Sequence, residues 1–196
     1  MPDLRLKLAA RVRLLSWISL AYMAVEGGVA LWAGAEADSV ALLGFGLDSV
    51  IEGLASVIVI WRFTGARTFS EAAEQRARKA VAVTFFLLAP YIVVEVVLGG
   101  RPEPSWVGIG LAVASLIVMP ALGVAKKRLG ARLGSGATSG EGSQNLLCAY
   151  LAGAVLLGLL GNALFGLWWL DPAVALLVAG LAVREGIENW RGDDCC

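Results

Sequence analysis

The chain has no histidine, few charged residues and only three cysteines, and each shortage excludes a class of function. Without histidine, the commonest protein ligand of metal ions and the usual acid–base catalyst are both missing. Two of the three cysteines are the terminal Cys195 and Cys196, so we expect no disulfide framework. The 16 basic and 16 acidic residues cancel, which leaves no overall field to attract nucleic acid. The sequence also lacks a phosphate-binding loop, a CxxC pair and a nucleophile–base pair, and we therefore expect neither an enzyme nor an organic cofactor.

Apolar residues make up 58% of the chain, against about 45–50% in average soluble domains. A helix that crosses a bilayer needs about 20 predominantly apolar residues, and six stretches are close to that length. They predict an all-α membrane protein, a bundle of six transmembrane helices embedded in a lipid bilayer. The predicted spans are roughly residues 14–34, 39–61, 80–98, 106–125, 145–165 and 167–183.

Positive charge is confined to one side of these spans. All of the 16 Lys and Arg residues except Arg101 fall in the N-terminal arm, in the loops after the second and fourth spans, or near the C-terminal end. Because Lys and Arg are enriched in cytoplasmic loops, we expect both termini in the cytoplasm. The chain then divides into a cytoplasmic arm (1–13), a transmembrane domain (14–190) and a short cytoplasmic tail (191–196) without a C-terminal soluble domain. An inner linker (126–143) joins the fourth and fifth spans, and its segment Arg132–Ser143, with a run of Gly, Ser and Thr, is expected to be flexible.

Two carboxylates lie close together inside the second predicted span. Asp48 and Glu52 are four residues apart, so both side chains project from one face of a helix. Carboxylates inside a membrane are energetically costly and are usually kept for function. No Lys or Arg lies inside the predicted spans to pair with them, and we therefore expect their partner to be protons or a bound cation.

Two further acids lie inside predicted spans. Glu26, in the middle of the first span, has three interpretations that the sequence leaves open: a third metal ligand, a proton carrier, or a buried acid in its neutral form. Glu95 lies nearer the outer end of the third span, where its side chain can reach the membrane interface, and is a weaker candidate.

The fifth predicted span carries a second polar pair, Gln144 and Cys148, again four residues apart. A thiolate is a good ligand for Zn²⁺ or Cd²⁺, and an amide oxygen is a weak one. Spacing alone favours a packing role for Cys148, because a lone buried cysteine usually behaves as a small hydrophobic residue. Counted from Asn145, Cys148 lies near the inner membrane surface, so we expect the helix to begin earlier, around Ser139–Glu141.

These features together resemble the transmembrane domain of the cation diffusion facilitator (cation efflux) family over roughly residues 14–190. The segment 39–52, from Ser39 through Asp48 to Glu52, is similar to that family's second-span motif, in which two acids bind the transported metal. Tyr91–Glu95 resembles its third span, and Asp171–Gly186 its sixth. The resemblance implies a homodimer and a metal site completed from span five.

The chain departs from that family in span five. The family usually places a His and an Asp there, and Gln144 and Cys148 stand at those positions in a pattern that resembles a divergent branch. The resemblance therefore implies that Cys148, and with less support Gln144, are metal ligands. The family's usual cytoplasmic metal-sensing domain has no counterpart in this sequence.

We therefore predict a proton-coupled divalent-cation exporter in a bacterial plasma membrane. Zinc is the favoured substrate, with cadmium, cobalt, manganese and iron as alternatives, and the predicted metal ligands are Asp48, Glu52, Cys148 and Gln144. Glu26, Glu52 or the thiol would carry the proton. One alternative is a proton-coupled carrier of organic cations in which Trp17, Tyr22 and Trp32 surround Glu26. The other is a membrane scaffold that transports nothing.

Overall fold

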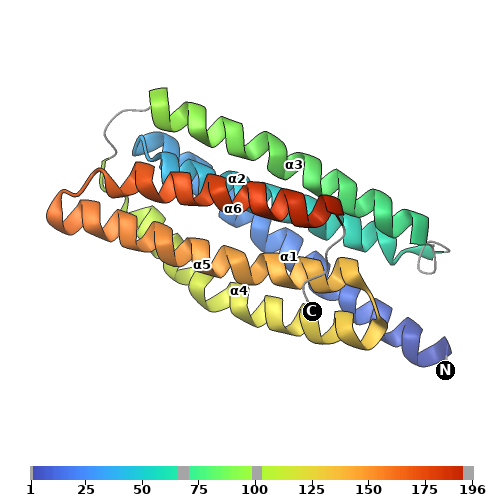
Figure 1. Cartoon of the computed structure of the whole chain (residues 1–196). Coiled ribbons are helices and arrows are strands. Elements are labelled where there is room, and N and C mark those ends of the chain that lie inside the picture. The colour runs from blue at the N-terminus through green and yellow to red at the C-terminus, as the bar shows by residue number, and fades with distance from the viewer. Residues whose placement is uncertain (1, 66–70, 99–102, 192–196) are drawn as a thin grey trace.

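The computed structural model describes residues 2–65, 71–98 and 103–191, apart from some side chains within the helices. Every regular element in these ranges is an α-helix, which confirms the predicted all-α class. In Figure 1 the helices run along the long axis of one bundle, and successive helices alternate in direction. Their bounds are α1 (Pro2–Glu36), α2 (Val40–Arg62), α3 (Glu71–Leu98), α4 (Trp106–Leu133), α5 (Gly136–Phe165) and α6 (Leu170–Arg191).

Serine caps set the starts of three helices. Ser39 accepts a hydrogen bond from the backbone N–H of Leu42 at the start of α2, at 3.2 Å. Ser105 and Ser135 cap α4 and α5 in the same way, which satisfies amide groups that have no partner within the helix. Between α4 and α5 the chain turns at Gly134, whose φ of 62° is a left-handed conformation that glycine adopts without strain.

Asp171 lies in the first turn of α6, and its carboxylate reaches across to the start of α2. One oxygen accepts a hydrogen bond from the Ser39 hydroxyl, and the other accepts from the backbone N–H of Ala41 at 3.1 Å. The carboxylate therefore satisfies the first turn of α2 and fixes α6 against it. This contact positions α6 beside the part of α2 that carries Asp48 and Glu52.

The helices pack most closely as the pairs α1–α2, α4–α5 and α3–α6. Glycines bring α4 and α5 together. A Cβ added to Gly123 would lie 2.8 Å from the carbonyl oxygen of Gly142, and a Cβ added to Gly142 would lie 2.8 Å from the carbonyl oxygen of Gly123. The expectation of a flexible segment at 132–143, within the inner linker 126–143, is therefore wrong. Residues 126–133 continue α4 and residues 136–143 begin α5, because the small residues there form a packing surface between two helices.

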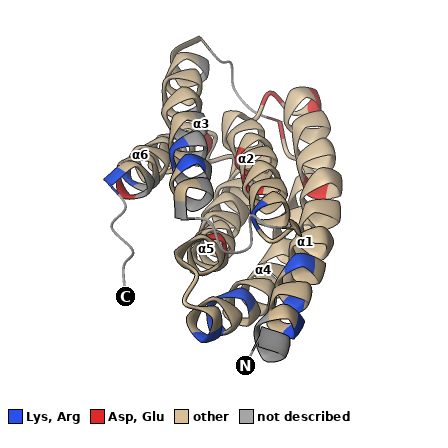
Figure 2. Ribbon diagram, turned by 90° about the vertical axis from the view of Figure 1, so that its right-hand side faces the viewer, with Lys and Arg blue, Asp and Glu red and all other residues tan. Residues whose placement is uncertain are grey.

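The outside of the bundle is strongly apolar. Large side chains such as Tyr150, Leu157 and Phe165 of α5 are at least 70% exposed, which would be unfavourable in water and suits contact with lipid. Within the described residues, four helices, α1, α2, α4 and α5, are long and apolar enough to cross a membrane. In Figure 2, Lys and Arg gather toward the end of the bundle at which α1 begins and α4 ends. The chain is an all-α integral membrane protein.

Candidate metal centre

Asp48 and Glu52 lie near the middle of α2, on the face that turns into the bundle. Only 6% of Asp48 and 3% of Glu52 is exposed. α2 holds them there because its small and apolar residues pack against α1 and its acidic face is turned toward α5 and α6. The predicted pairing of two acids on one helical face is thus found in the structure, in the interior rather than at the membrane surface.

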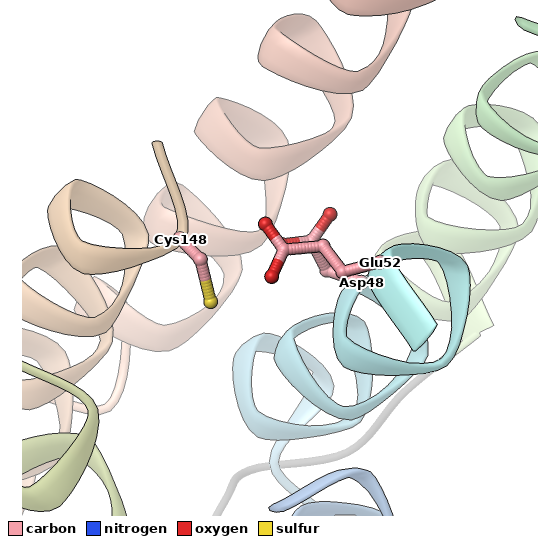
Figure 3. Close-up of side chains that lie close together, drawn as sticks. All are labelled: Asp48, Glu52 and Cys148. Atoms are coloured by element: carbon pink, nitrogen blue, oxygen red, sulfur yellow. The ribbon is translucent and has the colours of Figure 1, made fainter. Parts of the chain in front are cut away.

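Cys148 of α5 lies opposite this pair and is completely buried. Figure 3 shows Cys148 across the gap from the carboxyl groups of Asp48 and Glu52, which extend from α2 toward it. One potential ligand atom from each of Asp48, Glu52 and Cys148 lies within 4.8 Å of the others. Spacing along the chain favoured a packing role for Cys148, whereas the folded structure brings its thiol to the acidic pair.

A cavity of about 10 Å³ lies beside the carboxyl groups of Asp48 and Glu52. Its polar lining comes from Asp48, Glu52 and Gln144, and its apolar wall comes from Leu147 and Leu151 of α5 and from Val178, Leu181 and Ala182 of α6. That volume is about the size needed by a single water molecule, so the space suits one small ion. Gln144 thus lies at the site, as a lining residue of the cavity.

The donor set fits a small divalent cation. Carboxylate oxygens bind Zn²⁺ at about 2.0–2.2 Å and a thiolate at about 2.3 Å, so neighbouring ligand atoms in a tetrahedral site lie about 3.3–3.7 Å apart. The three groups need to move together by at most about 1.5 Å from the 4.8 Å spread of this structure. Oxygen combined with sulfur favours borderline metals such as zinc over Mg²⁺ or Ca²⁺.

Asn145, which we did not predict as a site residue, reaches the same centre. Its side chain is 1% exposed, and its amide nitrogen donates a hydrogen bond to Oε2 of Glu52 at 3.4 Å. The same nitrogen lies 3.5 Å from the sulfur of Met119 on α4. The amide oxygen Oδ1 has no hydrogen-bond partner in the structure.

A polar stripe along α5 is the signal that would have identified Asn145. Glu141, Gln144, Asn145 and Cys148 follow the spacing i, i+3, i+4, i+7, which places them along one side of a helix. All four are buried. In an otherwise apolar helix this pattern indicates an inward polar face, which the pair Gln144 and Cys148 alone does not reveal.

Glu26 lies in a separate cluster between α1, α2 and α4. It is 1% exposed and accepts hydrogen bonds from the hydroxyls of Ser49, at 2.9 Å, and Ser115. Tyr22 shares a hydrogen bond with Ser115 at 3.3 Å. This arrangement differs from the aromatic enclosure expected of an organic-cation carrier, because Trp17 and Trp32 are more than half exposed on the outside of the bundle.

The remaining candidates cannot be placed at the centre. Glu95 belongs to α3, but its side chain lies outside the part of the chain that the structure describes. Cys195 and Cys196 also lie outside the described residues.

A second buried acid, Glu141, has a cation of its own. The ammonium of Lys126 lies 2.7 Å from its carboxylate, and both side chains are buried. The hydroxyls of Ser16 and Ser56 donate to the same carboxylate at 3.0 and 2.7 Å. The expectation that no Lys or Arg lies inside the spans is therefore wrong, because the fourth candidate span runs from Trp106 to Leu133 and contains Lys126. Lys126 was assigned to a loop because α4 was predicted to end at residue 125, whereas α4 continues to Leu133.

Comparison with known proteins gives limited support for a family assignment. No protein-family model matches the chain. Transmembrane protein 163 of Xenopus laevis is 25% identical to it over 179 residues. That alignment covers 88% of this chain, and the chain spans 64% of the relative's length. The likeness agrees with a membrane protein, and the resemblance to the cation efflux family stays a prediction.

Proposed function

We propose that this protein transports a divalent metal cation and binds it between Asp48, Glu52 and Cys148. The observation that carries the proposal is that ligand atoms of two carboxylates and a thiol lie within 4.8 Å of one another inside a membrane bundle, and that the two carboxylates line an ion-sized cavity. Burying acidic groups together is costly unless a cation or protons neutralise them. A binding site near the middle of the spanning helices is the arrangement that alternating access requires.

Zinc is the proposed substrate of first choice. A site with two carboxylates and one thiolate offers both hard and soft ligands, a mixture that zinc and cadmium accept readily. Cobalt, manganese and iron are alternatives that share divalent charge and similar size. Competition between these metals for uptake ranks them directly.

We propose six spans with both termini in the cytoplasm and transport outward. The one-sided distribution of Lys and Arg along the bundle supports this orientation. An epitope tag at either terminus should be cleaved by added protease in inverted vesicles and protected in right-side-out ones. Protection in inverted vesicles would contradict the orientation.

Proton coupling follows from the chemistry of the ligands. Carboxylates and thiols bind metal in their deprotonated forms, so metal and protons compete for the same groups. Protons that enter from the outer side would release the metal there, and loss of protons to the cytoplasm would restore the site. Glu26 is the proposed additional proton carrier, because it is buried in the same interior next to Ser49, which follows Asp48 in α2.

Metal uptake into sealed proteoliposomes with an imposed pH gradient tests the transport proposal. Wild type should accumulate zinc, and Asp48→Asn and Glu52→Gln should each lose at least about a hundredfold in rate. Exposed Glu36 at the end of α1 provides the matched control, since Glu36→Gln makes the same acid-to-amide change away from the cavity. If no divalent metal moves, or if both site variants transport like wild type, the proposal is wrong.

The role of Glu26 is separable from metal binding. Glu26→Gln should preserve exchange of zinc between the two sides at equal pH and should lose the acceleration caused by the pH gradient. A variant that keeps its full response to the gradient would remove Glu26 from the coupling mechanism while leaving the metal site in place.

A further inference from the structure

Asn145 presents a buried polar atom that the fold does not explain. Its side chain is 1% exposed, and the amide oxygen Oδ1 has no hydrogen-bond partner among the described residues. Leaving a buried acceptor unsatisfied is unfavourable, and native structures contain few such atoms. An acceptor of this kind next to a cluster of metal-binding groups points to a role in binding a cation.

The position of the amide fits a metal ligand. Its nitrogen lies 3.4 Å from Oε2 of Glu52. Two oxygen ligands of one tetrahedral zinc ion lie about 3.3–3.6 Å apart, given metal–oxygen bonds of about 2.0–2.2 Å. The end of the amide group therefore already stands at the separation from Glu52 that two ligands of one ion would have.

The orientation of the amide suits the Glu52 carboxylate rather than a cation. In this orientation an N–H group faces the carboxylate and makes a favourable hydrogen bond. An amide nitrogen has no lone pair to offer a metal, whereas the amide oxygen does. A half turn about the Cβ–Cγ bond exchanges the two atoms and presents Oδ1 in place of Nδ2.

We propose that Asn145 is the fourth ligand of the metal centre and that its amide rotates when the ion binds. Resting on the proposed metal-transport function, this inference gives a site of two carboxylate oxygens, one thiolate and one amide oxygen. The amide donates to Glu52 in the empty site and ligates through Oδ1 in the filled site. The amide that contacts Glu52 belongs to Asn145, not to Gln144, at which the family resemblance placed the ligand.

A neutral fourth ligand has a consequence for transport. Asn145 binds or releases the ion without gaining or losing a proton, so only the two carboxylates and the thiol exchange protons with the metal. The rotation also replaces the metal–oxygen bond with a hydrogen bond to Glu52 as the ion leaves, which offsets part of the cost of emptying the site.

Cobalt titration of the purified full-length protein tests the proposal. Cys195→Ser and Cys196→Ser form the background, so that Cys148 is the one thiol. Four-coordinate Co²⁺ has intense visible bands, and a bound thiolate adds a charge-transfer band, so the spectrum reports coordination as well as affinity. We expect wild type to show both features. Asn145→Leu should bind cobalt at least about tenfold more weakly and lose intensity in the visible bands.

Asn145→Asp separates a ligand from a hydrogen-bond donor. Aspartate keeps an oxygen at the same place, so a ligand role predicts the four-coordinate spectrum and binding no weaker than in wild type. A donor role predicts the opposite, because a second carboxylate would face Glu52 without an N–H group. Asn145→Ala provides the same loss of ligand as Asn145→Leu if the larger side chain disturbs folding.

Two control variants complete the experiment. Asn162, another buried asparagine of α5, lies about five turns away along the helix, and Asn162→Leu should bind cobalt like wild type. Gln144→Leu should reduce affinity less than Asn145→Leu does. If Asn145→Leu and Asn145→Ala leave affinity and spectrum unchanged, or if Asn145→Asp binds as weakly as they do, Asn145 is not a ligand. If wild type itself gives no cobalt spectrum, the metal site of the proposed function fails, and the fourth ligand fails with it.

Discussion

Two buried acidic clusters lie one above the other in this bundle, and they differ in what surrounds their acids. The proposed metal centre consists of Asp48, Glu52 and Cys148, with an ion-sized cavity lined by its two carboxylates. The second, which we term the ion-paired cluster, consists of Glu141, Lys126, Ser16 and Ser56. Ser56 follows Glu52 by four residues on α2, so the two clusters are about one helical turn apart.

The ion-paired cluster carries its positive charge within the chain. One ammonium and two hydroxyls surround the Glu141 carboxylate, and they link α1, α2, α4 and α5. The metal centre brings together three groups that can each carry negative charge, and it leaves a space between helices. A buried acid therefore does not indicate transport by itself. The surroundings of the acid separate a fixed structural pair from a site that takes a mobile ion.

The largest effect on stability is expected from breaking the ion-paired cluster. Lys126→Met leaves Glu141 as a buried charge without its ammonium, which should destabilise the protein by about 3–5 kcal/mol. The double variant Lys126→Met/Glu141→Leu should recover most of that loss, because both charges are gone. Unfolding of the detergent-purified protein, followed by circular dichroism, measures the stability of both variants. Equal stability of Lys126→Met and wild type would contradict the structural role.

Zinc should stabilise the folded protein through the metal centre. A ligand at a hundred times its dissociation constant adds about 2.7 kcal/mol of stability. The increase in melting temperature should disappear in Asp48→Asn and persist in Glu36→Gln. A zinc-dependent increase of the same size in Asp48→Asn would show that the ion binds elsewhere.

Ser56→Ala tests whether the two clusters act separately although they are neighbours. Loss of the hydroxyl that donates to Glu141 at 2.7 Å should cost about 1.5–3 kcal/mol, the usual range for a hydrogen bond to a charged group. The affinity for zinc should stay that of wild type, as measured by isothermal titration calorimetry. A parallel loss of zinc affinity would mean that the clusters form one site.

The smallest effect is a gain in stability. In metal-free protein Asp48→Asn removes repulsion between two neighbouring carboxylates, which should raise the free energy of unfolding by about 1 kcal/mol. The same acid-to-amide change at Glu141 should lower it, because Lys126 loses its counter-charge. If the two substitutions change the free energy of unfolding in opposite directions, a functional acid is separated from a structural one. Changes in the same direction would remove the distinction.

Much of the fold follows from the sequence, because bilayer-length apolar segments predict helices directly. The connection between α4 and α5 did not follow. Ser139 and Gly142 indicated a flexible linker by composition, whereas they pack against α4: a Cβ added to Gly130 would lie 2.7 Å from the backbone nitrogen of Ser139. Small residues have this second use only when a partner helix is present, and composition alone cannot reveal the partner.

The candidate site was predictable from the sequence only where its residues share one helix. Asp48 and Glu52 lie on one helix, where spacing fixes their relative placement. Cys148 and Asn145 meet them across the α2–α5 interface, and that pairing depends on how the helices rotate against each other. Lys126 was counted among loop charges because the end of an apolar run does not mark the end of a helix.

X-ray absorption at the zinc edge tests the central claim most directly. The sample is zinc-loaded full-length protein that carries Cys195→Ser and Cys196→Ser. The account predicts one zinc per chain with a single sulfur at about 2.3 Å and oxygen ligands at about 2.0–2.2 Å. Cys148→Ser should remove the sulfur signal, and Asp48→Asn should lower the amount of zinc bound. Zinc without a sulfur ligand, or a spectrum that neither substitution changes, would contradict a metal centre between α2 and α5.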